Sequence, residues 1–83
     1  MKIFTTGRLA MLLGIHPSKI YRLMRKGELP SYRPRGLNWW LIPLSDEEIE
    51  LLLAKYGGKK EDVEKYALGE DFLLREVANE KTG

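Results

Sequence analysis

Apolar residues recur at helical spacing in three stretches of the chain, residues 5–13, 17–26 and 45–56. Between the second and third stretches, the pattern over residues 32–42 changes to that of β-strands. The apolar residues on the three helical faces are Leu9, Leu12, Leu13, Ile20, Leu23, Met24, Ile49, Leu52, Leu53 and Tyr56. This pattern predicts a mostly α fold with a small β-hairpin before the third helix.

The first two predicted helices are bounded by residues that favour helix ends. Thr5 or Thr6 can begin the first helix, and Gly14 can end it. Pro17 suits the first position of the second helix, because an N–H there would have no intrahelical partner. Gly27 is placed to end that helix, so a short turn joins the two helices.

A capping box marks the start of the third helix. Ser45 and Glu48 have the spacing at which each side chain caps the backbone N–H of the other. Two glycines at positions 57–58 end the helix. We therefore expect one domain over residues 1–56 and a C-terminal extension over residues 57–83.

The extension contains two apolar patches separated by Gly69. The patches are Val63, Tyr66 and Ala67, followed by Phe72, Leu73 and Val77. They predict two additional short helices that pack on the domain or on a second copy of the chain. The segment is too short and irregular for a long coiled-coil seam, and a homodimer and a monomer both stay open.

The predicted hairpin has strands at residues 32–34 and 39–42, joined by a tip at residues 35–38 that contains a glycine. The polar residues expected near the tip are Arg33, Arg35 and Asn38. A hairpin of this kind next to two helices is a wing, which can reach a minor groove or the adjacent phosphates. The alternative is a plain surface hairpin.

Strand alternation divides the second strand of the hairpin between two faces. Trp40 and Ile42 share one face and are expected to join the core. Trp39 and Leu41 share the other, which the C-terminal helices or a second subunit would have to cover.

The formal net charge of +2 is unevenly distributed. Residues 1–44 contain eight lysines and arginines against one acid, Glu28, which gives +7. Residues 45–83 contain six lysines and arginines against eleven acids, which gives −5. The first part is where a polyanion is expected to bind, and the alternative is an uneven solvated surface.

Much of the positive charge lies on one face of the second helix. The residues on this face or beside it are Ser18, Lys19, Tyr21, Arg22, Arg25 and Lys26. No acid interrupts the face to form ion pairs along the helix. Arginine can make paired hydrogen bonds to guanine edges, and Tyr, Ser and Lys can reach phosphates. This composition favours DNA recognition over a merely solvated surface.

Arg8 and His16 lie near the starts of the two helices. If Thr5 is the N-cap, Arg8 takes the third helical position, where the helix dipole disfavours a cation. A phosphate across that helix end would reverse the penalty, and the alternative is a solvated side chain. His16 precedes Pro17, so its side chain can cap the second helix or contact a phosphate.

The residue content excludes several kinds of site. The chain has no cysteine and one histidine, so disulfides and zinc fingers are excluded and we expect no metal site. Nothing in the sequence resembles a nucleophile elbow, a phosphate loop, a metal-ligand cluster or a recombinase catalytic segment, so we expect neither catalytic residues nor a cofactor. No apolar run approaches the roughly 18 residues of a membrane span, and we expect a soluble, cytoplasmic protein.

Residues 3–56 resemble the MerR-like winged helix-turn-helix family, especially its small excisionase-type and phage or plasmid regulators. The resemblance rests on the run FTTGRLAMLLGIHPSKIYRLMRKGELPSYRP, on WLIP after the predicted hairpin, and on the acidic start of the next helix. It implies a recognition helix at residues 17–26 and a wing at residues 32–42. It also implies a role in transcription control or site-specific recombination.

The sequence departs from the family pattern at three places. Arg8 stands where the family usually has glutamate, and His16 stands where serine or threonine is usual. Residues 37–39 replace arginines that are common in the wing. We therefore expect this wing tip to contact DNA less strongly than a typical one, or to contact protein instead.

Together these features predict sequence-specific binding to double-stranded DNA by a small transcription regulator or an excisionase-like architectural factor. The expected contacts are Lys19, Lys26 and Arg8 with phosphates, Tyr21, Arg22 and Arg25 with the major groove, and Arg33, Arg35 and Asn38 with the flanking backbone or minor groove. No effector domain follows, so we expect no small-molecule effector. The alternative function is a protein-interaction module that uses Trp39 and Leu41 on a winged-helix scaffold.

Overall fold

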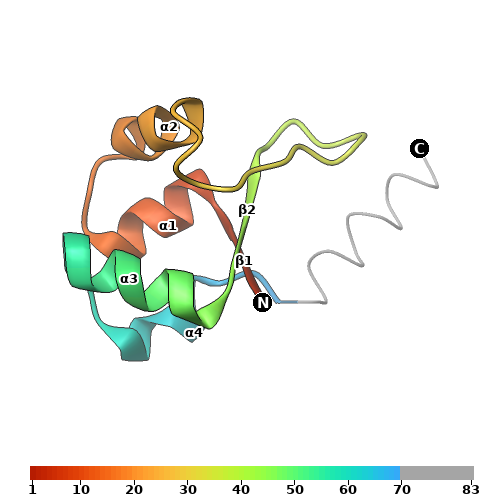
Figure 1. Cartoon of the computed structure of the whole chain (residues 1–83). Coiled ribbons are helices and arrows are strands. Elements are labelled where there is room, and N and C mark those ends of the chain that lie inside the picture. Colours follow the sequence, from red (N-terminus) through yellow and green to blue (C-terminus); the bar gives the residue numbers. More distant parts are fainter. Residues whose placement is uncertain (70–83) are drawn as a thin grey trace.

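The computed structural model, in which residues 1–69 are described, places four α-helices and a small sheet around one core (Figure 1). In chain order the elements are β1 (Lys2–Thr5), α1 (Thr6–Leu13), α2 (Pro17–Arg25), β2 (Leu41–Leu44), α3 (Asp46–Tyr56), the 3-10 helix η1 (Lys60–Asp62) and α4 (Val63–Tyr66). The predicted fold class is confirmed, because the chain is mostly helical with one small antiparallel sheet.

Helix α1 begins and ends at the predicted residues. The Thr5 hydroxyl oxygen accepts a hydrogen bond from the Arg8 backbone N–H at 3.2 Å, so Thr5 is the N-cap. At the other end, the Gly14 N–H donates to the carbonyls of Ala10 and Met11. These bonds satisfy backbone groups that a helix end leaves without partners.

Helix α3 begins with the predicted capping box. The Ser45 hydroxyl accepts from the Glu48 backbone N–H at 3.1 Å, and the Glu48 carboxylate accepts from the Ser45 backbone N–H at 2.9 Å. The helix ends at Tyr56, directly before Gly57. Both boundaries agree with the sequence prediction.

The sheet is not the predicted hairpin. Strand β2 pairs antiparallel with the N-terminal strand β1, with Thr5 opposite Leu41. The pairing within the predicted hairpin is a single bridge, in which Tyr32 and Leu41 exchange backbone hydrogen bonds of 2.9 and 2.7 Å. The predicted strand at residues 32–34 is therefore wrong. The strand predicted at residues 39–42 instead begins at Leu41 and has β1 as its partner, and residues 30–40 form a loop that we call the 30–40 loop.

Two prolines and a tight turn explain why the Tyr32–Leu41 bridge does not extend into a longer pair of strands within the 30–40 loop. Pro30 and Pro34 lie on either side of the bridge and cannot donate a backbone hydrogen bond. The Leu37 N–H donates to the Pro34 carbonyl at 3.1 Å and closes a tight turn. Gly36 sits at the third position of that turn with φ 91°, a conformation typical of glycine in a type II turn.

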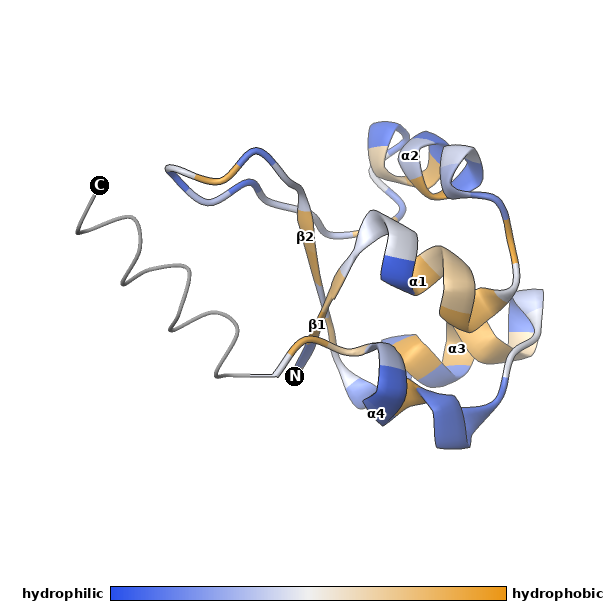
Figure 2. Ribbon diagram, turned by 180° about the vertical axis from the view of Figure 1, so that it is seen from behind, coloured by the Kyte–Doolittle hydropathy of each residue, from blue (hydrophilic) through white to orange (hydrophobic). Residues whose placement is uncertain are grey.

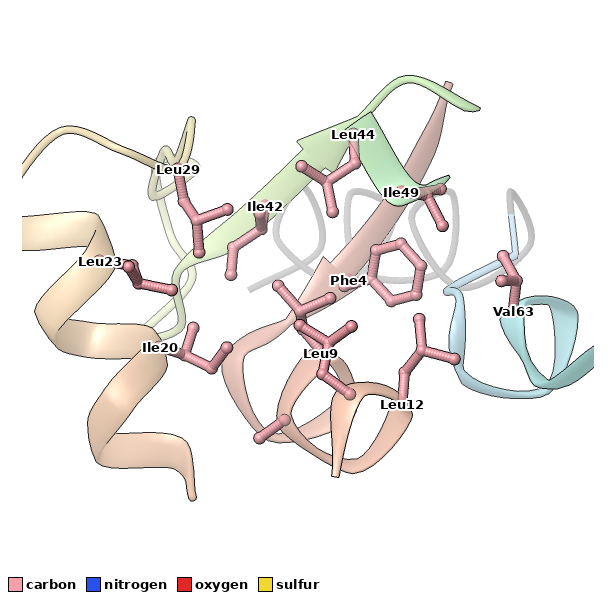
Figure 3. Packing of buried hydrophobic residues seen from close by; sticks show 12 residues of the cluster. Phe4, Leu9, Leu12, Ile20, Leu23, Leu29, Ile42, Leu44, Ile49 and Val63 are labelled. Atoms are coloured by element: carbon pink, nitrogen blue, oxygen red, sulfur yellow. The ribbon is translucent and has the colours of Figure 1, made fainter. Parts of the chain in front are cut away.

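The core has Phe4 at its centre, surrounded by side chains from α1, β2, α3 and α4 (Figure 3). Helix α1 is the element on which the others assemble, since it contacts α2, α3, α4 and β1. The fully buried large side chains are Phe4, Leu9, Leu13, Ile20, Leu41, Ile42 and Leu44. The predicted apolar faces of the three main helices are confirmed as core-facing, although Met24, Leu52, Leu53 and Tyr56 are only partly buried.

The two tryptophans and Leu41 differ from the alternation prediction. Ile42 is buried as expected, but Trp40 remains 41% exposed and Leu41 is fully buried. The strand begins at Leu41, so alternation does not apply to Trp39 and Trp40, which belong to the 30–40 loop. The protein-interaction alternative therefore loses Leu41 as a docking residue.

The first apolar patch of the C-terminal extension packs on the domain. Val63 is buried, and Tyr66 and Ala67 lie against the core. The Leu68 N–H donates to the Ile3 carbonyl at 2.7 Å, so β1 has a partner on each edge. The second predicted patch, with Phe72, Leu73 and Val77, lies outside the described residues.

Candidate nucleic-acid interface

Helix α2 turns an apolar side to the core and a polar side to solvent (Figure 2). Ile20 and Leu23 are buried against the rest of the domain. The six predicted recognition residues are all exposed: Ser18, Lys19, Tyr21, Arg22, Arg25 and Lys26. The structure thus presents these six side chains at one accessible helix, which we call the α2 face.

The α2 face is not neutralised by ion pairs within residues 1–69. The salt bridges found there join Lys2 to Glu64 at 2.8 Å and Lys60 to Glu50 at 3.0 Å. The hydrogen bonds to these carboxylates, and their negative charge, raise the pKa values of Lys2 and Lys60 above the ordinary lysine value. The arginines of α2 therefore keep their positive charge available for an external anion.

His16 caps the start of α2. Its Nδ1 accepts the Ser18 backbone N–H at 3.1 Å and lies 2.9 Å from the Ser18 hydroxyl oxygen. Pro17 follows as the first helical residue, as predicted. Of the two roles considered for His16, the helix cap is confirmed. The imidazole nitrogen accepts the hydrogen bond that a serine or threonine hydroxyl usually accepts at this position.

Tyr21 connects the α2 face to the beginning of α1. The Thr6 hydroxyl donates to the Tyr21 phenol oxygen at 3.3 Å. Tyr21 is nevertheless 45% exposed. The bond limits the rotamers of Tyr21 while leaving its phenol edge accessible to a ligand.

The two lysines of the α2 face lie at its margins. Lys19 places its Nζ 5.1 Å from the centroid of the Tyr56 ring, at the end of α3. Lys26 is the C-cap residue of α2, and its backbone N–H donates to the Arg22 carbonyl. Both lysines therefore lie toward the ends of the α2 face rather than at its centre.

The 30–40 loop lies on the same side of the molecule as α2 (Figures 1 and 2). Its predicted contact residues Arg33, Arg35 and Asn38 are all exposed. The Arg33 guanidinium lies 5.7 Å from the centroid of the Trp40 ring, a cation–π arrangement. The α2 face and the base of this loop therefore adjoin in one surface, and the tip of the loop extends away from α2 (Figure 1).

Arg8 is not part of this surface. Its guanidinium donates to the Tyr66 carbonyl at 3.5 Å, which directs the side chain toward α4. Thr6 of the same helix bonds to Tyr21, so the side chains of Arg8 and Thr6 lie on different sides of α1. The sequence argument placed Arg8 at a helix start but could not predict that α4 would lie beside it.

Sequence reasoning missed Trp40 as a surface residue near α2. Tyr21, Met24, Arg25, Ser31 and Trp40 line a hollow of about 230 Å³ between α2 and the base of the 30–40 loop. Pro34 within the predicted first strand and Pro30 just before it were the available signal, because prolines there argue against a regular hairpin and therefore against strand alternation.

Two further features, a metal-binding cluster and a membrane-spanning helix, are not found among the described residues. No group of three or more His, Asp or Glu side chains within residues 1–69 is arranged to hold a metal ion. No helix in the same part of the chain is long and apolar enough to cross a membrane.

A protein-family model described as a helix-turn-helix domain matches residues 3–46. The match covers just over half of the chain and includes β1, α1, α2, the 30–40 loop and β2. The chain belongs to this family. The family comprises excisionase-like and MerR-like helix-turn-helix domains, so the predicted resemblance is confirmed. A search of curated proteins and a search of solved structures return no match.

Membership in this helix-turn-helix family supports DNA as the partner of the chain. Domains of the family are typically non-enzymatic. The paired helices that define the motif correspond to α1 and α2, and the second of them carries the exposed basic face.

Proposed function

We propose that the chain binds double-stranded DNA sequence-specifically, as a small transcription regulator or an excisionase-like architectural factor. Helix α2 lies in the major groove, and the 30–40 loop acts as a wing on the flanking backbone or minor groove. The observation that carries this proposal is the α2 face, which has three exposed basic residues within the helix and no acidic residue. Like charges concentrated in this way repel one another unless an anion binds.

Base reading is assigned to the centre of the α2 face. Arg22 and Arg25 are exposed, and each has a planar fork of donors that matches the acceptor pair on the guanine edge. Tyr21 lies beside them, held by Thr6. Its ring can pack on a thymine methyl group, and its hydroxyl can bond to a phosphate.

Backbone binding is assigned to the margins of the α2 face and to the loop. Lys19 and Lys26 flank the helix, and the capped start of α2 adds His16 and Ser18. The loop contributes Arg33, Arg35 and Asn38. Arg8 is left out of this assignment, because its guanidinium contacts α4.

The deciding experiment is selection of bound duplexes from a random DNA pool at near-physiological salt. The parent chain is compared with an Arg22→Ala, Arg25→Ala variant. A Lys59→Ala, Lys65→Ala variant is the control, because it removes the same charge from the η1–α4 segment, away from the α2 face. We expect the parent and the control to enrich one motif and the α2 variant to lose it.

Two results would count against the proposal. If the parent enriches no motif, the chain does not bind DNA sequence-specifically. If the α2 variant enriches the same motif as the parent, another surface reads the bases. The symmetry of an enriched motif also separates a dimer from a monomer, since a two-fold dimer selects a palindromic site.

A further inference from the structure

The hollow between α2 and the base of the 30–40 loop has two large aromatic side chains in its wall. Tyr21 is 45% exposed and Trp40 is 41% exposed. Met24, Arg25 and Ser31 complete the lining of its roughly 230 Å³. Aromatic surface left in water at a concave site is costly unless a ligand covers it.

Neighbouring interactions hold Trp40 at this place. The adjacent Leu41 exchanges two backbone hydrogen bonds with Tyr32 and lies opposite Thr5 of β1. Arg33 stacks its guanidinium over the Trp40 ring, at 5.7 Å. Arg25 therefore lines the hollow, and a second cation, Arg33, lies against the Trp40 ring at its side.

This combination is complementary to a sugar–phosphate unit. A deoxyribose ring offers an apolar face to an aromatic side chain, and the attached phosphate offers a negative charge to an arginine. A nucleobase alone would not use the flanking cations, and an apolar peptide would leave them unpaired. Charge complementarity thus selects a nucleic-acid backbone as the occupant.

The position of the hollow indicates which part of the DNA backbone would bind in it. In the proposed function α2 lies in the major groove and the loop touches the neighbouring minor groove. One DNA strand separates those two grooves, so its backbone must cross the gap between α2 and the loop.

We infer that this hollow binds one deoxyribose and its phosphate from the strand between the two grooves. Trp40 packs on the sugar, Tyr21 borders the hollow on the α2 side, and Arg33 binds the phosphate. The inference rests on the proposed function, and it makes Trp40 a positioning residue that fixes how far α2 enters the groove. Because every nucleotide carries the same sugar and phosphate, the contact is independent of sequence.

The first test uses fluorescence, since the chain has two tryptophans. A Trp39→Phe variant retains Trp40 alone, and a Trp40→Phe variant retains Trp39 alone. Each is titrated with the selected duplex and with a random duplex. We expect the emission of Trp40 to change on saturation with both duplexes, and to change more than that of Trp39.

The second test measures affinity. Trp40→Ala should weaken binding to the selected and the random duplex alike, by about tenfold, as expected for losing a buried aromatic contact. The salt dependence should not change, because no charge is removed. Trp39→Ala is the matched control and should have a smaller effect, and thermal unfolding shows whether each variant is folded.

The outcomes separate this inference from the proposed function. Parent binding with unchanged Trp40 emission and normal affinity of Trp40→Ala overturns the inference alone. A loss confined to the selected duplex also overturns it, because Trp40 would then read a base. If Trp40→Ala fails to fold, the Trp39→Phe titration still decides. If the parent binds no duplex, both fail.

Discussion

Helix α2 and the η1–α4 segment are joined to the same scaffold but use their charges in opposite ways. On the η1–α4 side, Glu64 pairs with Lys2, and Lys60 pairs with Glu50. On the α2 side, the described residues provide no acidic partner for Arg22 or Arg25 within an ion pair. The η1–α4 side forms ion pairs within the fold, whereas the arginines of α2 remain available to bind a ligand.

The difference matters for recognition more than for stability. Exposed ion pairs contribute little to the free energy of unfolding, so the pairs on the η1–α4 side do not explain why the domain is folded. They show instead that this surface has little unbalanced charge to offer. Substitutions on the two sides should accordingly affect different measurements.

The largest expected effect is on stability, at the turn that leads to η1. Gly58 has φ 109°, and a Cβ there would collide with the Leu12 carbonyl oxygen and press on the Leu53 side chain. We expect Gly58→Ala to lower the free energy of unfolding by about 3 kcal/mol in chemical denaturation. Gly57→Ala is the control, because its φ of 98° is similarly strained but its Cβ meets open space. Equal losses in the two variants would show that the collision is relieved at no cost.

The next effect is on affinity, at the centre of the α2 face. Arg22→Ala should weaken binding to the preferred duplex by about 1–3 kcal/mol and reduce its preference over random DNA. Its thermal unfolding should match that of the parent. Lys59→Ala, which removes a positive charge near η1, should leave affinity nearly unchanged. The comparison between the two regions fails if both variants lose affinity equally.

A smaller effect on stability is expected at the turn between α1 and α2. His16→Ala removes the side chain that accepts the Ser18 N–H and should cost about 1 kcal/mol of unfolding free energy. His16→Ser restores a capping oxygen and should recover most of the loss. Denaturation of all three chains checks this, and an unaffected alanine variant would mean that the cap contributes nothing.

Lys26, at the C-terminal end of α2, should contribute to the salt dependence of DNA affinity. Lys26→Ala is expected to weaken binding to all duplexes alike and to reduce the slope of log affinity against log salt by about 1. Titrations at several salt concentrations measure this slope. An unchanged slope would remove Lys26 from the set of phosphate contacts.

The smallest effect should be a pH dependence on the η1–α4 side. The raised pKa values of Lys2 and Lys60 mean that their contribution to stability is complete below the unfolded lysine pKa of 10.5 and is lost as pH rises above it. Unfolding midpoints should therefore fall slightly more for the parent than for a Lys2→Met, Lys60→Met variant between about pH 9 and 12. Parallel curves would show that these exposed pairs contribute nothing to stability.

Local signals predicted the helices of this fold well. Thr5, Gly14, Pro17 and Ser45 act on backbone groups only a few residues away, so the ends of α1, the start of α2 and the start of α3 follow from the sequence. The α2 face could be predicted for the same reason, because helical periodicity alone brings its side chains together.

The parts that could not be predicted depend on distant partners. Strand β1 is four residues long and pairs with residues about forty positions later, so nothing near it marks it as a strand. Because β1 supplies the partner of β2, Leu41 is buried and Trp40 lies outside the sheet. Arg8 contacts α4 for a similar reason, since Tyr66 is 58 positions away in sequence.

Strand β1 has β2 on one edge and Leu68 on the other, and this arrangement bears on how the protein is made. Ile3 and Leu68 are 65 positions apart, so their bond closes nearly the whole described chain into a loop. The α1–α2 hairpin is local and can form while the polypeptide is still being synthesised. Strand β1, although translated before α1 and α2, acquires its last partner only after position 68 has left the ribosome.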